Sequence, residues 1–113
     1  MEILDTLEKF SEIIVSVDII EFLEDERITK AKAKVTLQNY SVLWIREVSF
    51  EDQTISYSYY WLRSDNSLII GWDNAPHHQE IETFPHHEHI GKNAESSQET
   101  SLSQVLTYIQ DIL

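Results

Sequence analysis

Cysteine is absent from the 113 residues of this chain. Its absence excludes a disulfide framework and a thiolate metal site, so imidazole and carboxylate groups remain as the side chains able to bind a metal. A chain without disulfides fits a reducing compartment. Long hydrophobic runs are also absent, and the chain begins Met1-Glu2-Ile3-Leu4-Asp5 without a basic segment. We therefore expect no membrane span and a cytoplasmic location.

Basic residues are scarce in this chain. Eight lysines and arginines stand against twenty aspartates and glutamates, which gives a formal net charge of -12. Such a charge repels nucleic acid and anionic membranes at long range, so any phosphate site has to be local. Acidic side chains crowd the first quarter of the chain, where Lys9 is the only basic residue before Arg27. This asymmetry indicates either a surface for a basic partner or a solvated acidic face.

Length and periodicity predict a single α+β domain covering residues 1–113, whose 42% hydrophobic content is enough for one core. Apolar residues at helical spacing predict a helix over residues 2–11, and a capping box at Ser101 and Gln104 begins a C-terminal helix. Alternating and β-branched runs predict five strands between the helices, at residues 13–23, 30–37, 42–50, 55–61 and 68–72. Short connections favour an antiparallel meander. The segment 73–91 has no regular period, and 92–100 resembles a mobile connection.

All five histidines lie within thirteen residues, in two units that each begin with a proline: Pro76-His77-His78 and Pro85-His86-His87-Glu88-His89. Each proline fixes its own φ and biases the residue before it toward extended geometry, so the backbone is stiff ahead of each histidine pair. If the second unit is extended, His87 and His89 project to one side and His86 to the other. Only some of the five can therefore face a common substrate or ion.

General acid–base catalysis is the first interpretation of this cluster, because imidazole titrates near neutral pH and both accepts and donates protons. RNA cleavage needs one group to take the 2′-hydroxyl proton, another to protonate the leaving 5′-oxygen, and a cation for the charged phosphorane. Arg46, inside a predicted strand, is our candidate cation. The candidate catalytic residues are Arg46, His77, His78, His86, His87 and His89.

A metal site is the second interpretation. Several imidazoles together with Asp73, Glu80 or Glu88 match the nitrogen and oxygen ligands of zinc, nickel, manganese or iron, although the spacing matches no standard zinc signature. The divalent-metal set that we expect in this case is Asp73, His86 and His89.

A structural role is the third interpretation. His77 or His86 would then hydrogen-bond to the backbone of a packed loop, and Asp73 and Asn74 would form an Asx-type turn. The residues alone leave all three interpretations open, and different histidines can have different roles.

Two further patterns each have a functional and a structural explanation. The alternating lysines of the second predicted strand could steer RNA, but we favour protection of an exposed sheet edge; they are Lys30, Lys32 and Lys34. The aromatic residues of the fourth predicted strand could stack on bases, but if they share the face of Ile55 they belong to the core; they are Tyr57, Tyr59 and Trp61.

Three segments carry a resemblance to a known family: Tyr57-Ser58-Tyr59-Tyr60-Trp61, residues 72–78 from Trp72 to His78, and residues 83–89 from Thr83 to His89. They resemble the TumE-type toxin family of two-gene toxin–antitoxin systems, and the resemblance spans nearly the whole chain. It implies a growth-inhibiting toxin, an antitoxin partner and ribonuclease activity on an RNA substrate. By motif it places the site at Asp73 and the five histidines, with Arg46 and Glu47 beside them.

We therefore predict the toxin component of a toxin–antitoxin system, acting as an endoribonuclease through histidine acid–base catalysis. The alternatives are a metal-binding or ligand-binding domain and a non-enzymatic partner-binding module. Metal content and RNA cleavage by the purified protein would separate them.

Overall fold

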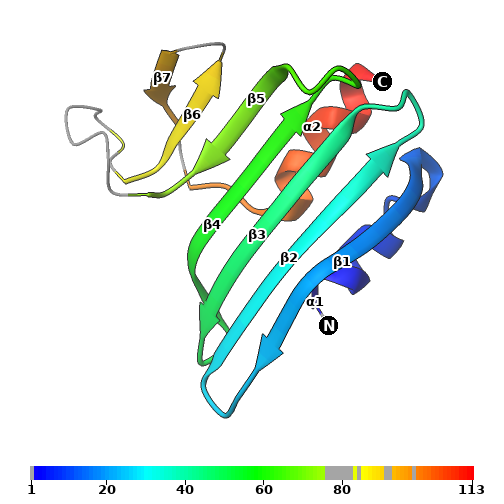
Figure 1. The fold of residues 1–113 in the computed structure, drawn as a ribbon. Helices are drawn as coiled ribbons and strands as arrows, with labels where there is room; N and C mark the ends of the chain where they lie inside the picture. Colours follow the sequence, from blue (N-terminus) through cyan, green and yellow to red (C-terminus); the bar gives the residue numbers. More distant parts are fainter. Residues whose placement is uncertain (1, 76–82, 84, 91–92, 98) are drawn as a thin grey trace.

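A computed structural model describes residues 2–75, 83, 85–90, 93–97 and 99–113 (Figure 1). Its elements in chain order are α1 (Glu2–Glu8), a 3-10 turn (Ser11–Ile13), β1 (Ile14–Glu24), β2 (Ile28–Leu37), β3 (Val42–Phe50), β4 (Gln53–Leu62), β5 (Leu68–Asp73), β6 (His87–Ile90), β7 (Asn93–Ser96) and α2 (Leu102–Ile112). The predicted α+β class is confirmed, with one helix before the strands in the chain and one after them. The first helix is shorter than expected, because it ends at Glu8.

The strands form one antiparallel sheet in the order β1-β2-β3-β4-β5-β6-β7, so the predicted meander is confirmed. The expectation of about five strands was too low. β6 lies in the segment expected to be irregular, and β7 lies in the segment expected to be a mobile connection. Both are four residues long, which is too short for a period of two to stand out, and β6 contains one apolar residue, Ile90.

The hairpin connections are closed by short polar side chains at the predicted turns. Asp25 Oδ1 accepts the backbone N–H of Ile28 at 2.9 Å, and Asp65 Oδ1 accepts that of Ser67 at 2.9 Å. These side chains replace backbone partners that a tight turn cannot supply, which fixes where each strand reverses. These two reversals connect β1 to β2 and β4 to β5, and they help to fix the register of those two pairs.

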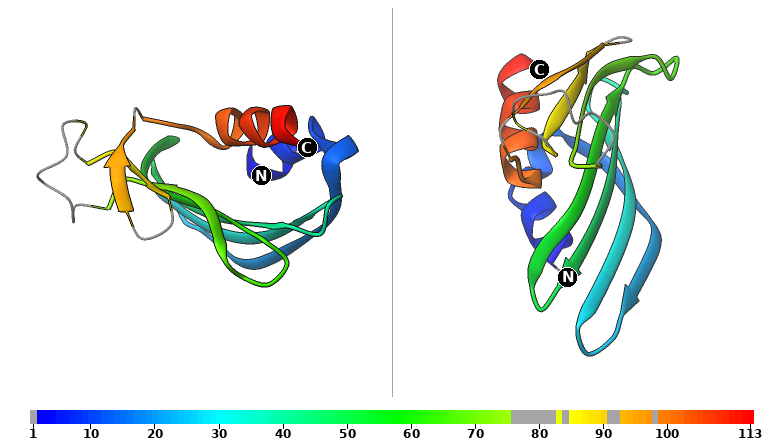
Figure 2. Two further views of the ribbon diagram at one scale, coloured as in Figure 1. Left: turned by 90° about the horizontal axis from the view of Figure 1, so that it is seen from above. Right: turned by 90° about the vertical axis from the view of Figure 1, so that its left-hand side faces the viewer.

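One face of the sheet, which we call the inner face, packs against α1 and α2 on the hollow side of the curved sheet (Figure 2). Its buried residues come from alternate positions of the central strands and from one side of each helix: Ala31, Ala33, Val35, Leu37, Leu43, Ile45, Tyr57, Tyr59, Trp61, Ile3, Leu7, Leu102, Val105, Leu106 and Ile109. The core interpretation of Tyr57, Tyr59 and Trp61 is thus confirmed, whereas Ile55 is exposed. The predicted capping box of α2 is present, with Ser101 N–H donating to Gln104 Oε1 at 3.0 Å.

The opposite face, which we call the outer face, carries the intervening residues of the same strands. Lys30, Lys32 and Lys34 lie on it. Our edge-protection explanation for these lysines is wrong, because β2 pairs with β1 on one side and β3 on the other. The edge strand is β1. Within the part of the chain that the structure describes, no helix is long and apolar enough to cross a membrane.

Candidate functional site

Asp73, the last residue of β5, lies at the centre of the site and is 5% exposed. The strand register places it on the outer face, opposite Ser58 of β4 and His87 of β6. Its Oδ1 accepts the backbone N–H of Ala75 at 3.0 Å. This contact is the expected Asx-type turn, and it turns the chain away from β5 just after the carboxylate.

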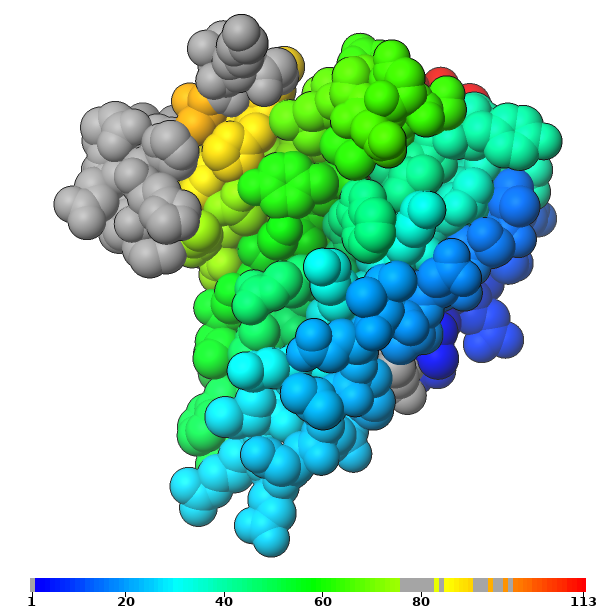
Figure 3. Space-filling model, viewed as in Figure 1, coloured from blue at the N-terminus to red at the C-terminus, as the bar shows by residue number. Residues whose placement is uncertain are grey.

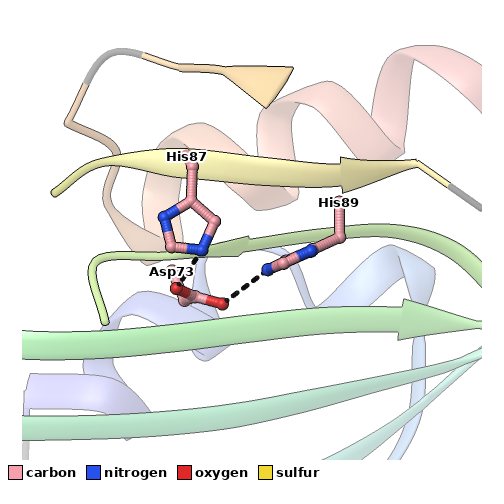
Figure 4. Close-up of side chains that lie close together, drawn as sticks. All are labelled: Asp73, His87 and His89. Atoms are coloured by element: carbon pink, nitrogen blue, oxygen red, sulfur yellow. Dashed lines mark hydrogen bonds and ion pairs between the residues drawn. The ribbon is translucent and has the colours of Figure 1, made fainter. Parts of the chain in front are cut away.

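His87 and His89 approach this carboxylate from β6 (Figure 4). His87 Nε2 lies 2.7 Å from Oδ1 of Asp73, and His89 Nε2 lies 3.0 Å from Oδ2. The Tyr60 hydroxyl of β4 donates a short hydrogen bond to Oδ2. With the Asx turn, each carboxylate oxygen has two partners, which fills the acceptor sites of the carboxylate.

The contacts of His87 define how its protons are placed. Its Nδ1 lies 2.8 Å from the carbonyl oxygen of Pro85, and since a carbonyl only accepts, Nδ1 carries a proton. The other nitrogen, His87 Nε2, then faces Oδ1 of Asp73 at hydrogen-bond distance. The His87 side chain is 2% exposed, so this pair is sealed from solvent.

His89 and Tyr60 form the accessible part of the site. The His89 side chain is 24% exposed, and its ring stacks on that of Tyr60 with centroids 5.8 Å apart. Burial, followed by the hydrogen bond to Asp73 and the charge of that carboxylate, raises the pKa of Tyr60. The hydroxyl therefore stays protonated as a donor that holds Asp73 in place.

His86 lies apart from this group, as the alternation of an extended unit predicts. Its Nδ1 lies 2.8 Å from the hydroxyl of Tyr57, an inner-face residue, and the two rings stack with centroids 5.8 Å apart. The expected metal set was Asp73, His86 and His89. The structure brings His87, instead of His86, next to Asp73 and His89.

Arg46 and Glu47 point to opposite faces of β3. Arg46 lies exposed on the outer face, in register with Ser58 and, through it, with Asp73, which places it roughly 10 Å from that residue by strand spacing. Glu47 lies on the inner face and accepts the Tyr59 hydroxyl at 2.7 Å. Of this pair, only Arg46 shares a face with the site. His77, His78 and Glu80 lie outside the described residues.

A family comparison now connects this geometry with a biological role. The family model described as Toxin TumE matches residues 3–113. The chain belongs to the TumE toxin family. It is thus the toxin component of a toxin–antitoxin system, and the family implies an antitoxin partner. No curated protein and no solved structure gave a significant match.

Sequence reasoning missed Tyr60 and Gly71 of this TumE-family toxin. A Cβ at Gly71 would lie 2.2 Å from Cδ1 of the Tyr60 ring, so only glycine leaves room for that ring to lie across β5 toward Asp73. Tyr60 and Gly71 are register partners on neighbouring strands. The signal was in the aromatic string, where the residue between two inward-facing aromatic residues had to face outward.

Three ligand-type atoms of the toxin, one each from Asp73, His87 and His89, lie within 4.8 Å of one another. Two chemistries are open to such a group. With its shared protons it is a carboxylate that orients and charges imidazoles, and without them it offers two nitrogens and an oxygen to a divalent cation. Distances of 2.7 and 3.0 Å between these atoms suit hydrogen bonds in the first case, which we call the protonated network.

Proposed function

We propose that this toxin is an endoribonuclease in which His89 is the imidazole that reacts with RNA. The observation that supports the proposal is the difference in exposure within one network. His87 and Asp73 are buried, whereas His89 shares the same carboxylate and is open to solvent. Among the three, His89 is the group that a substrate can reach, and the other two orient it.

The proposed reaction uses the two nitrogens of His89 differently. Its Nε2 faces Asp73, so in the neutral ring Nε2 carries the proton and Nδ1 is the base. Nδ1 takes the proton of a ribose 2′-hydroxyl, the 2′-oxygen bonds to phosphorus, and the bond to the 5′-oxygen breaks. Asp73 stabilises the imidazolium that forms. The products are a 2′,3′-cyclic phosphate and a 5′-hydroxyl, whose proton comes from a second acid.

Our candidates for this second acid are His77 and His78, which follow Asp73 closely in the sequence. Arg46 remains our candidate cation, with a changed role. A guanidinium two strands from Asp73 is placed for the phosphate of a neighbouring nucleotide more than for the phosphate being cleaved.

The test is cleavage of cellular RNA by protein purified without a histidine tag and freed of its antitoxin. His89→Ala should lower the rate by about 10²–10⁴-fold without unfolding the protein. His86→Asn is the matched control, because it changes a histidine three residues away that contacts Tyr57 and not Asp73. If the wild-type protein cleaves no RNA, with or without added divalent metal, the ribonuclease proposal fails.

A divalent-metal site is the second candidate, supported by the convergence of Asp73, His87 and His89. Elemental analysis of tag-free protein distinguishes it. A stoichiometric ion that His89→Ala removes and His86→Asn retains would favour the metal site over the protonated network. Activity that resists a chelator would count against it.

A further inference from the structure

The outer face carries two neighbouring rows of side chains that cross the strands and end at the site. In the first row, successive register partners from β1 to β6 are Asp18, Lys34, Trp44, Tyr60, Gly71 and His89. In the second row they are Glu21, Lys32, Arg46, Ser58, Asp73 and His87. The outer face is turned toward the viewer in Figure 3, and Figure 2 shows the helices on the other side of the sheet.

The part of this face formed by β2, β3 and β4 has a charge opposite to that of the whole chain. Four of the eight basic residues lie on it: Lys30, Lys32, Lys34 and Arg46. The described residues of β2, β3 and β4 place no carboxylate there, because Glu47 points inward. Screening limits the reach of the remaining negative charge to about 8 Å at physiological ionic strength, so the local cations dominate close to the face.

Two aromatic side chains stand between the cations and the site. Trp44 and Tyr60 are direct cross-strand partners, and with Lys32, Arg46 and neighbours they line an open hollow of about 420 Å³. The ammonium groups of Lys32 and Lys34 each lie 5.7 Å from the centre of the Trp44 ring. Aromatic faces flanked by cations are the elements that hold the bases and phosphates of single strands.

We propose that this surface, the outer-face track formed by Lys32, Lys34, Trp44, Arg46 and Tyr60, binds single-stranded RNA and leads it to His89. Bases stack on Trp44 and Tyr60, and phosphates contact the lysines and the guanidinium. A duplex is excluded because its base faces are covered by their neighbours. Asp18 and Glu21 close the track at β1 by repelling phosphate. The inference rests on the proposed function for the reaction at its end.

Binding is measured with a 2′-O-methyl RNA oligonucleotide, which lacks the attacking hydroxyl and cannot be cleaved by the proposed route. Trp61 and Trp72 are buried, so quenching of tryptophan fluorescence reports stacking on Trp44. Trp44→Leu should abolish the quenching and weaken binding about tenfold. Lys34→Gln should reduce the slope of log affinity against log salt by about 0.7. Lys9→Gln, outside the track, should change neither.

A matched duplex that binds as tightly as the single strand would overturn the track, as would wild-type affinity in both track variants. So would track variants that weaken antitoxin binding and leave RNA binding unchanged. If the oligonucleotide binds along the track but native RNA is not cleaved, the track stands and the ribonuclease proposal fails. If both track variants cleave native RNA at the wild-type rate, the ribonuclease proposal stands and the track fails.

The edge strand β1 supports a second, independent inference. It is eleven residues long, ends the sheet, and on its outer edge pairs with no other strand of the described residues. It contains neither lysine nor proline, the residues that usually protect an edge. Its exposed apolar side chains are Val15, Ile19, Ile20, Phe22 and Leu23.

We infer that the antitoxin adds an extended segment to β1, and that this segment is apolar and basic. Unpaired backbone groups provide the hydrogen bonds of strand addition, and the exposed side chains provide apolar contact. The acidic residues around the edge determine the charge of the partner: Glu12, Asp18, Glu21 and Glu24, with Glu2, Asp5 and Glu8 of α1. A second copy of this chain would oppose carboxylates to carboxylates, so it is a poor occupant.

The test uses the purified antitoxin and two isoleucines of similar exposure, Ile20 at 52% and Ile55 at 56%. Ile20→Lys should weaken antitoxin binding at least tenfold, because it removes apolar contact and adds repulsion to a basic segment. Ile55→Lys on β4 should bind like wild type. Equal affinities would overturn the inference. A wild-type dimer that Ile20→Lys dissolves would also overturn it, because a second copy would then occupy the edge.

Discussion

On the inner face of the sheet, most alternate residues of β2, β3 and β4 are apolar or aromatic, with Glu47 as a charged exception, and they lie under two helices. The residues between them, on the outer face, include the basic, aromatic and hydroxyl-bearing side chains together with aliphatic ones such as Val42, Val48 and Leu62, and they are half-buried or exposed. Neighbours in sequence therefore have unrelated roles: Tyr59 with Tyr60, Arg46 with Glu47. Because strand geometry separates the two faces, a substitution on the outer face can change the site without entering the core. Each adjacent pair is a ready comparison between stability and activity.

Asp73→Asn should have the largest effect on the outer face. The amide keeps the size of the carboxylate but offers one acceptor oxygen in place of two, and it cannot stabilise a charged imidazole. RNA cleavage should fall on the order of 10³-fold. The rate of product formation measures it, and circular dichroism checks that the fold persists. Near-normal cleavage would remove Asp73 from the reaction.

Gly71→Ala should disturb the site next most, although alanine is chemically inert. The new Cβ would meet the Tyr60 ring at 2.2 Å, so the ring has to leave its place and lose its contact with Asp73. We expect cleavage to fall about 10- to 100-fold, at the scale of one lost hydrogen bond to a charged group. A combined variant with Tyr60→Phe should be no worse than Gly71→Ala alone. An additive loss would indicate another cause.

Tyr60→Phe and Tyr59→Phe sharpen the comparison within one pair. Each loses a hydroxyl that donates to a carboxylate, Asp73 outside and Glu47 inside. Both should lower the free energy of unfolding by about 1–2 kcal/mol. Only Tyr60→Phe should lower cleavage, by about tenfold. Equal losses of activity would show that the faces are not independent.

Glu47→Gln should have the smallest effect, and it concerns stability alone. Burial, opposed in part by the Tyr59 hydroxyl, raises the pKa of Glu47 above its ordinary value of 4.5. The folded state therefore binds the Glu47 proton more tightly than the unfolded state does. The contribution of this group to stability is fully present below pH 4.5 and is lost as pH rises through the raised pKa. Glutamine removes this loss and should raise the unfolding midpoint slightly at pH 7 but not at pH 4. Thermal melts at both pH values measure it.

The part of the fold that could be predicted depended on the alternation of side chains along the strands and on the capping box. Ser101 and Gln104 begin α2 as expected, and the alternation that separates His86 from His87 and His89 is visible in the sequence. Such features depend on neighbours along one element. They need no knowledge of which strands meet.

The unpredicted part depends on strand order and register. The lysines of β2 were assigned to an edge, but only the sheet order shows that β1 is the edge. The approach of His87 to Asp73 requires β6 to pair with β5 in one register. The position of the Tyr60 ring requires a residue without a Cβ at position 71, which is Gly71. None of these contacts is encoded by local periodicity.

The pairing of β6 has a consequence for how the toxin responds to thermal fluctuation. This four-residue strand carries both imidazoles of the site, and among the described residues it pairs with β5 along Gly71, Trp72 and Asp73. Detaching β6 leaves the core under α1 and α2 intact, so its opening free energy lies below that of global unfolding. Amide hydrogens of β6 should exchange faster than those of β2 or β3. In the opened form the chain would be folded but inactive, and its activity would return when β6 pairs with β5 again.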